Sequence, residues 1–133
     1  MRLLGMPQGT RQTGIAGVKT YQTRPCAECP WRLDVAPGQF PPERFAALAH
    51  TAYDMSLGQF ACHKSPEGGE FGCAGFVLRG AVHNLGARLA MHRGVLDPDA
   101  VTSDVPLHPN YRAMAIAHGV DPDDPVLRAC RDD

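Results

Sequence analysis

The feature that most constrains this chain is a group of four cysteines between residues 26 and 73. Cys26 and Cys29 form a C-x2-C pair, and Cys62 and Cys73 follow farther along the chain. A C-x2-C pair places two thiolates on one tight turn, and two further soft ligands complete a four-coordinate site. The sequence therefore predicts one metal centre, with Cys26, Cys29, Cys62 and Cys73 as its ligands.

The prolines and glycines limit the regular structure that can surround such a centre. Of 133 residues, 12 are proline and 14 are glycine, and both residue types interrupt helices and strands. The length fits a single domain with a modest core. We expect a mainly α fold with irregular loops, in which short helices surround the metal site, and at most a short β-hairpin. In such a fold a bound metal contributes stability that a small core does not supply.

Apolar spacing and helix-ending residues predict where the helices lie. Proline suits the first turn of a helix, and glycine suits its end. We predict a helix from Pro41 to Leu57, a helical region from Cys73 to Arg93 with a break near Gly80, and a helix from Asn110 to Gly119. A last short helix carries residues 126–129.

Residues 1–24 show neither helical nor strand periodicity. They carry several basic residues, and no acidic residue precedes Glu28. We predict a flexible basic N-terminal arm over 1–24 and a single metal-binding domain over 25–133. The arm is either a solvated tail or a segment that touches phosphate or a partner.

Cys62 and His63 compete for the third ligand position, because the side chains of adjacent residues diverge. Cys62 is favoured, and His63 would then donate to a ligand sulfur or act as a neighbouring acid or base. Trp31, the single tryptophan, is expected to shield the metal and to anchor the core. Arg32 is expected to brace the loop, and Cys130 to be a spare thiol.

The metal itself is open between zinc and an iron–sulfur cluster. Pro30 lacks the backbone N–H that would otherwise be available to a ligand sulfur, which argues against a standard zinc knuckle. A Cys-Pro step also occurs in bacterial iron–sulfur runs. Zinc is nevertheless favoured, because four cysteines, or three cysteines and a histidine, suit its tetrahedral geometry. A metal-free dithiol is the remaining interpretation.

The charge and the lack of recognisable targeting signals limit the expected partners and the expected compartment. The net charge of −1 and the pI near 6.6 provide no global attraction to nucleic acid. The N-terminal residues do not resemble a secretory signal, and no apolar run is long enough for a membrane span. We expect a cytoplasmic protein without a membrane partner. In a reducing compartment, clustered cysteines are better interpreted as metal ligands than as disulfides.

Familiar catalytic strings are absent from the sequence, including G-x-S-x-G, H-E-x-x-H and a Walker loop. The leading hypothesis is a non-enzymatic regulatory or interaction module that binds a protein or nucleic-acid partner. The first alternative is an iron–sulfur redox sensor.

The second alternative is a metal-dependent enzyme acting on nucleic acid, with His63, His83, Asn84 and Arg88 near an ion that keeps an open position. It requires that one cysteine, most plausibly Cys62, is not a ligand. Asn84 and Arg88 lie one helical turn apart and are candidates for contact with an anion or a substrate, or else for simple solvated helix polarity.

Several motifs together resemble a known family. They are Pro25-Cys26-x-x-Cys29-Pro30-Trp31-Arg32-x-Asp34, Gly38-x-Phe40-Pro41, Cys62-His63, Cys73-Ala74-Gly75 and Asn84-x-x-x-Arg88-Leu89-Ala90. Over residues 24 to 94 the chain resembles an uncharacterised family of small proteins from actinobacteria and their phages. The resemblance implies that the four cysteines, His63 and Trp31 form one unit, and it implies no function.

Overall fold

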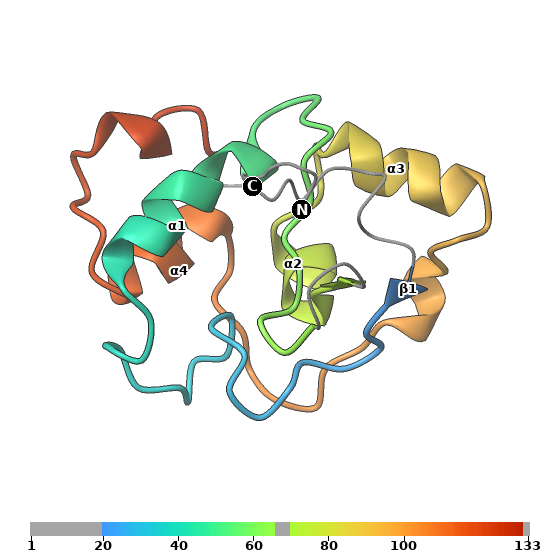
Figure 1. The fold of residues 1–133 in the computed structure, drawn as a ribbon, viewed down its shortest axis with the longest axis horizontal. Helices are drawn as coiled ribbons and strands as arrows, with labels where there is room; N and C mark the ends of the chain where they lie inside the picture. Colours follow the sequence, from blue (N-terminus) through green and yellow to red (C-terminus); the bar gives the residue numbers. More distant parts are fainter. Residues whose placement is uncertain (1–19, 66–69, 132–133) are drawn as a thin grey trace.

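The structure is a computed structural model, and it describes residues 20–65 and 70–131. Short helices joined by long irregular segments make up most of it (Figure 1). The helices are α1 (Pro42–Leu48), η2 (Ala49–Ala52), α2 (Ala74–Arg79), α3 (Leu85–His92), η3 (Pro98–Ala100), α4 (Tyr111–Ala117) and η4 (Pro125–Leu127), where η denotes a 3-10 helix. The expectation of short helices separated by irregular loops is confirmed.

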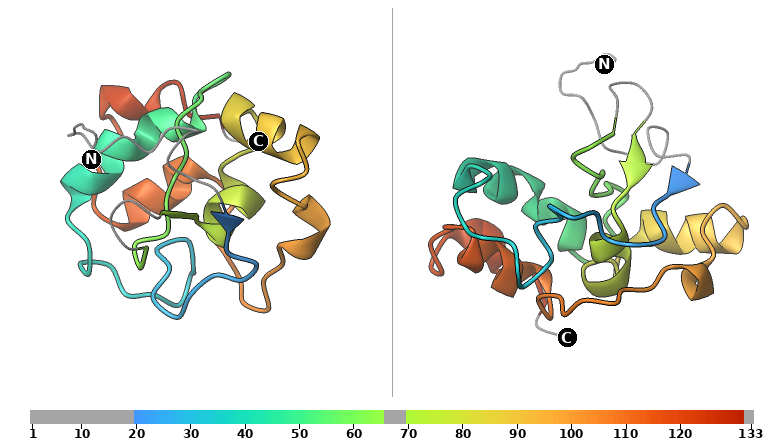
Figure 2. Two further views of the ribbon diagram at one scale, coloured as in Figure 1. Left: turned by 45° about the vertical axis from the view of Figure 1, so that its right-hand side comes forward. Right: turned by 90° about the horizontal axis from the view of Figure 1, so that it is seen from below.

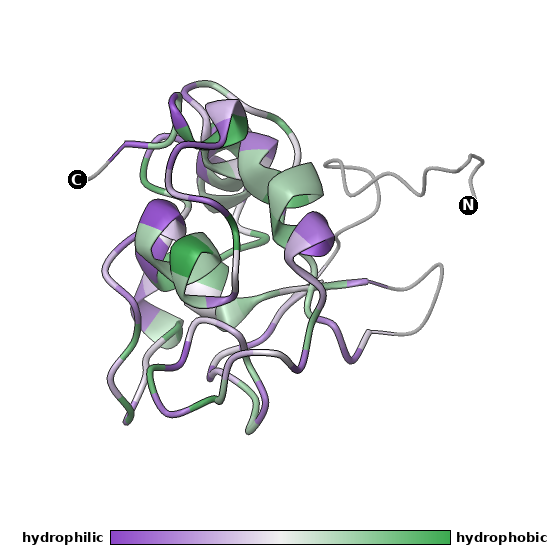
Figure 3. Ribbon diagram, turned by 90° about the vertical axis from the view of Figure 1, so that its left-hand side faces the viewer, coloured by the Kyte–Doolittle hydropathy of each residue, from purple (hydrophilic) through white to green (hydrophobic). Residues whose placement is uncertain are grey.

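The helices lie in two groups with α2 between them. Helices α1 and α4 lie side by side at one end, and α3 lies at the other (Figures 1 and 2). The segment that carries Cys26 and Cys29 runs along one edge of the molecule (Figure 2). Hydrophilic stretches are spread over helices and loops alike (Figure 3). Within residues 20–65 and 70–131, no helix has both the length and the apolar composition needed to cross a membrane.

The sheet differs from the expected hairpin. Strand β1 (Thr20–Tyr21) pairs in parallel with β2 (Phe71–Gly72), so the two strands come from distant parts of the chain. Among the described residues, antiparallel contacts occur as isolated bridges, one between Ala61 and Gly72 and one between Arg32 and Leu107. The hairpin prediction is therefore wrong for the sheet itself, because β2 pairs in parallel with a strand near the start of the described chain, and a parallel pair cannot be joined by a short turn.

Strand β1 falls inside the segment predicted as an arm. Tyr21 donates its hydroxyl to Gln59 Oε1 at 2.5 Å, and the Gln22 N–H donates to the Gly72 carbonyl at 3.0 Å. A Cβ at Gly72 would overlap the Tyr21 ring, so glycine is required where the two strands meet. Residues from Thr20 onward are therefore docked on the domain. The rest of the predicted arm, residues 1–19, lies outside the described residues.

Trp31 is the centre of the hydrophobic core. Its side chain is fully buried, and its ring packs edge-on against Phe60 and Tyr111 at centroid distances of 5.9 and 5.7 Å. Gly75 and Gly80 both lie against the indole, and a Cβ at either position would come within 2.6 Å of a Trp31 atom. Gly75 in α2 and Gly80 at its C-cap therefore permit a close approach of helix and ring.

The predicted helices are present but shorter. Helix α1 ends at Leu48 and tightens into η2, where the Thr51 hydroxyl donates to the Leu48 carbonyl at 2.7 Å. A side chain that bonds the backbone in this way competes with helix propagation. The break predicted near Gly80 is confirmed, because α2 ends at Arg79 and α3 begins at Leu85.

Candidate metal centre

The first half of the candidate centre is a tight turn at Cys26 and Cys29. The Cys29 N–H donates to the Cys26 carbonyl at 3.1 Å, and the Arg32 N–H donates to the Cys29 carbonyl at 3.1 Å. The backbone N–H of Glu28 faces the Cys26 sulfur, and that of Trp31 faces the Cys29 sulfur. In both cases the donor lies two residues after the cysteine.

The donors in this turn show why the missing N–H of Pro30 does not count against a metal site. Pro30 follows Cys29 directly, whereas the N–H groups that face the sulfurs come from Glu28 and Trp31. The missing proline N–H therefore removes no donor from the turn. Both N–H groups favour the thiolate, which is the form of cysteine that binds metals.

The second half comes from the two ends of the loop between Cys62 and Cys73. The Cys62 N–H donates to the Phe71 carbonyl at 2.7 Å, and the Cys73 N–H donates to the Phe60 carbonyl at 3.0 Å. These two bonds surround the Ala61–Gly72 bridge and hold the loop ends side by side. Cys73 then precedes the first turn of α2, where the Gly75 N–H faces the Cys29 sulfur.

Cys29 and Cys73 form a close, buried pair. Their sulfurs lie 3.7 Å apart, and both side chains are buried. A disulfide requires an S–S distance of about 2.0 Å, whereas two thiolates on one tetrahedral zinc lie roughly 3.8 Å apart, from a Zn–S bond of about 2.3 Å. The pair therefore has the separation that a shared metal ion requires.

Without a metal, the contact between the two sulfurs shifts the pKa values of the two thiols in opposite directions. The hydrogen bond from Cys73, followed by the Trp31 and Gly75 N–H groups, lowers the pKa of Cys29 against the opposing effect of burial. The hydrogen bond to Cys29, burial and the Cys29 charge raise the pKa of Cys73 well above its usual value. The two thiols titrate as a unit.

Cys26 and His63 form a second pair nearer the surface. The Cys26 sulfur lies 3.2 Å from His63 Nε2. A sulfur and a nitrogen on one tetrahedral zinc lie roughly 3.6 Å apart, so the observed distance is that of a hydrogen bond. Burial, with the Lys64 charge, lowers the pKa of His63 and favours the neutral imidazole that binds metals.

Cys62 connects the two pairs electrostatically. Its charge raises the pKa of both Cys26 and Cys73, although burial dominates at Cys26 and the Cys29 hydrogen bond dominates at Cys73. Across the described part of the chain, however, no group of three or more His, Cys, Asp or Glu side chains is already arranged to hold a metal ion. The predicted ligands thus lie as two neighbouring pairs plus Cys62, and the competition between Cys62 and His63 stays open.

Charged side chains brace the turns that carry these groups. Lys64 Nζ lies 3.1 Å from Glu28 Oε1, so an ion pair joins the Cys26–Cys29 turn to the segment after His63. Arg32 donates two hydrogen bonds of 2.7 Å to Asp34 and a longer one of 3.4 Å to the Cys26 carbonyl. The bracing expected of Arg32 is therefore present.

Asn84 and Arg88 have structural partners. Asn84 is buried, caps α3 through the Ala87 N–H at 2.7 Å, and donates to the Thr51 and Gly58 carbonyls at 2.9 and 2.6 Å. Arg88 donates twice to the Val82 carbonyl, at 3.1 and 2.8 Å. This geometry favours helix capping and loop bracing for both residues.

Cys130 lies apart from the candidate centre. It is buried, and its thiol donates to the Ala49 carbonyl at 3.7 Å. Burial raises the pKa of Cys130 to about 11. It is thus a packed thiol that stays protonated at neutral pH.

His118 is a residue near the centre that the sequence did not single out. Its Nε2 donates to the Pro30 carbonyl at 2.8 Å, which ties α4 to the Cys26–Cys29 turn. Its ring stacks on Phe45 at 4.9 Å. No sequence signal could have found it, because a histidine at a helix end far along the chain carries no spacing that relates it to the cysteines.

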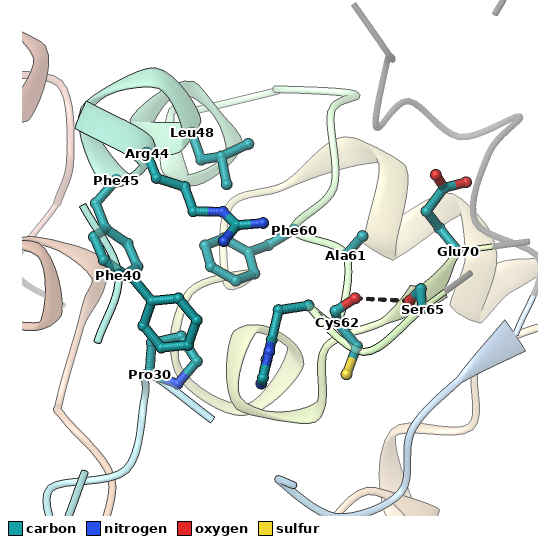
Figure 4. Close-up of a pocket in the computed structure, with 11 residues that line it drawn as sticks. Pro30, Phe40, Arg44, Phe45, Leu48, Phe60, Ala61, Cys62, Ser65 and Glu70 are labelled. Atoms are coloured by element: carbon teal, nitrogen blue, oxygen red, sulfur yellow. Dashed lines mark hydrogen bonds between the residues drawn. The ribbon is translucent and has the colours of Figure 1, made fainter. Parts of the chain in front are cut away.

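A pocket of about 330 Å³ adjoins the centre (Figure 4). Its apolar lining residues are Pro30, Phe40, Phe45, Leu48, Phe60 and Ala61. Its polar lining residues are Arg44, Cys62, His63, Ser65 and Glu70. The pocket therefore shares Cys62 and His63 with the candidate centre.

Comparison with known proteins yields one match. A family model described as "Family of unknown function (DUF6283)" matches residues 21–131. No curated protein and no solved structure matches the chain. The matched range contains all four predicted cysteine ligands, His63 and the pocket.

Proposed function

The chain belongs to DUF6283, a family of unknown function, and we propose that it is a metal-binding protein with one centre at Cys26, Cys29, Cys73 and either Cys62 or His63. The observation that carries the proposal is the buried Cys29–Cys73 pair, whose sulfurs lie 3.7 Å apart. Two cysteines distant in sequence meet there at the separation of two ligands on one ion.

The surroundings of the pair support a metal over a simple dithiol. Backbone N–H groups from Trp31 and Gly75 face the Cys29 sulfur, and such donors stabilise negative charge on sulfur. A disulfide at this pair would require the two sulfurs to move from 3.7 Å to about 2.0 Å apart. A bound cation would also remove the repulsion that the Cys29 charge exerts on Cys73.

Zinc is the favoured metal, and an iron–sulfur cluster is the alternative. Zinc requires only four donors at the corners of a tetrahedron and stabilises small domains directly. The turn with its two N–H groups suits either metal, because sulfur ligands of iron–sulfur clusters also accept hydrogen bonds. When bound, zinc would supply structural cross-linking of the 26–29 turn with the loop ends at Cys62 and Cys73.

We propose a non-enzymatic regulatory or interaction role for this module, in the cytoplasm, with a protein or nucleic-acid partner. The support is that Arg32 and Lys64, the charged side chains beside the cysteines, are engaged in ion pairs that brace the centre. A metal-dependent enzyme acting on nucleic acid is the weaker alternative, since Asn84 and Arg88 are engaged in capping and bracing contacts. The origin in actinobacteria and their phages rests on the motif resemblance alone.

Elemental analysis and the visible spectrum of anaerobically purified protein test the proposal. We expect one equivalent of zinc and no colour, and a brown preparation would identify the cluster instead. The variants Cys29→Ser and Cys73→Ser should lose the metal, whereas Cys130→Ser, a buried cysteine outside the centre, should retain it. Full folding of the wild-type protein without any metal would refute the proposal.

The fourth ligand is assigned by cobalt substitution. Cobalt(II) bound in place of zinc absorbs visible light, and its absorption depends on how many thiolates bind it and on the geometry of the site. Its spectrum therefore changes when a ligand is replaced. If Cys62 is the ligand, Cys62→Ser should alter the spectrum and His63→Ala should leave it unchanged. The opposite pair of results would assign His63.

A further inference from the structure

The pocket beside the cysteines has a preformed apolar wall. Phe45 and Phe60 are almost fully buried, and Phe40 is 9% exposed, so their rings are held in place by the core. Phe40 packs edge-on against both Phe45 and the His63 ring, at 6.0 and 5.1 Å. A rigid aromatic wall can bind an apolar ring without losing conformational entropy of its own side chains.

One positively charged side chain, that of Arg44, lies at one end of this aromatic wall. The Arg44 guanidinium lies 5.8 Å from the centre of the Phe40 ring and projects over the pocket (Figure 4). No ion pair to Arg44 occurs within residues 20–65 and 70–131. Glu70 lies at the opposite end of the pocket from Arg44 (Figure 4).

The other polar lining groups are already engaged. The Ser65 hydroxyl donates to the Cys62 carbonyl at 2.7 Å and accepts from the Phe71 N–H at 2.8 Å. His63 Nε2 faces the Cys26 sulfur. The guanidinium of Arg44, which presents planar paired donors, is therefore the group that selects a ligand here.

We propose that this pocket binds a small aromatic carboxylate, with its ring against Phe40 and Phe60 and its carboxylate paired with Arg44. The volume of about 330 Å³ is at the lower end of the usual range for small-molecule sites, which favours a ligand of one ring. The positive charge of Arg44 favours an anion and disfavours an amine. This goes beyond the proposed metal centre and does not depend on it.

The test uses the full chain as purified, with phenylacetate as the probe and phenylacetamide as its neutral counterpart. Binding is followed by amide chemical shifts in two-dimensional NMR. We expect phenylacetate to bind about tenfold more tightly than the amide, which is the effect of one charge-assisted contact. The shifts should cluster around Phe40, Arg44 and Phe60.

Variants assign the effect to the arginine. Arg44→Gln should abolish the preference for the carboxylate, and Arg44→Lys should retain part of it. Arg93→Gln is the matched control, because Arg93 is also an exposed arginine but lies outside the pocket. Equal binding of acid and amide, or an unchanged preference in Arg44→Gln, would overturn the proposal.

Two further measurements distinguish a small-molecule ligand from a peptide end, and distinguish failure of the pocket proposal from failure of the metal-centre proposal. The tripeptide Gly-Gly-Phe presents the same ring and carboxylate on a peptide end, and tighter binding of the tripeptide than of phenylacetate would overturn the assignment to a small molecule. Metal content is measured on the same samples. Retained metal with no carboxylate preference would refute the pocket alone, whereas a metal-free folded protein that prefers the carboxylate would refute the centre alone.

Discussion

The contact between Gly75 and Trp31 allows one substitution to be argued quantitatively. A Cβ at Gly75 would lie 2.6, 2.7 and 2.8 Å from three Trp31 atoms, which is closer than side chains pack. Trp31 is fully buried among Phe60, Phe76 and Tyr111, so the indole has no free space into which it can rotate. Gly75→Ala therefore forces the helix and the ring apart.

The expected loss in free energy of unfolding is the cost of overpacking minus the gain from a better helix former. Overpacking of a closed core costs about 1 to 3 kcal/mol, and three close contacts with the Cβ and ring of a fixed tryptophan correspond to the upper part of that range. Alanine is a better helix former than glycine, by roughly 0.5 kcal/mol in a first turn. The net loss is about 2 kcal/mol, equivalent to a decrease in Tm of roughly 6 to 10 °C for a domain of this size.

Thermal unfolding measured by circular dichroism tests this value. Gly58→Ala is the matched control, because the nearest atoms to its added Cβ belong to His50, an exposed side chain that can rotate away. The control should change Tm by no more than about 2 °C. If Gly75→Ala melts with the control or above it, the packing argument is wrong.

The same substitution has a second readout at the candidate centre. The Gly75 N–H faces the Cys29 sulfur, so a displaced α2 also withdraws a donor that favours the thiolate. We expect Gly75→Ala to release its metal to a chelator faster than wild type at a temperature where both are folded. Gly58→Ala should release metal at the wild-type rate.

Two further predictions concern groups outside the centre. Asn84→Ala removes a helix cap and takes a donor from the buried Thr51 carbonyl and the half-buried Gly58 carbonyl. We expect a loss of about 3 kcal/mol in urea unfolding with unchanged metal content, and metal loss in the folded variant would contradict the structural role. Cys130 has a pKa raised from 9.0 to about 11, so the folded state holds its proton where the unfolded state has lost it. Its contribution is therefore complete below about pH 9 and is lost as the pH rises to about 11, by roughly 2 kcal/mol. Cys130→Ala should lose less stability than wild type over that window, and parallel pH profiles would refute the assignment.

Parts of the fold were accessible from sequence because local chemistry determines them. Pro42 at a helix start, the break near Gly80 and the Asn110 cap of α4 each depend on neighbouring residues alone. The parallel pairing of Thr20–Tyr21 with Phe71–Gly72 was not accessible. A two-residue strand carries no periodic signal, and its partner is set by tertiary packing.

In the candidate site, too, the sequence predicted the local features and not those that depend on tertiary packing. Spacing predicted the Cys26–Cys29 turn, and the structure shows that turn with its N–H groups facing the sulfurs. Spacing could not predict that Cys29 pairs with Cys73 while Cys26 pairs with His63, because those pairings follow from the bridge at Ala61 and Gly72. The pocket with Arg44 was also missed, since it forms only when α1 packs beside the Phe60 segment.

The arrangement of the two pairs suggests how the proposed centre fills. The Cys29–Cys73 pair is buried and held by backbone donors, so it is already close to the spacing of two ligands on zinc. Cys26 and His63 are only partly buried, and the ion pair that joins their segments is half exposed and weak. One half of the proposed centre is therefore already spaced for a metal, and the half nearer the surface can adjust to it. We expect Lys64→Gln, which breaks that ion pair, to change the rate of metal uptake more than the final affinity.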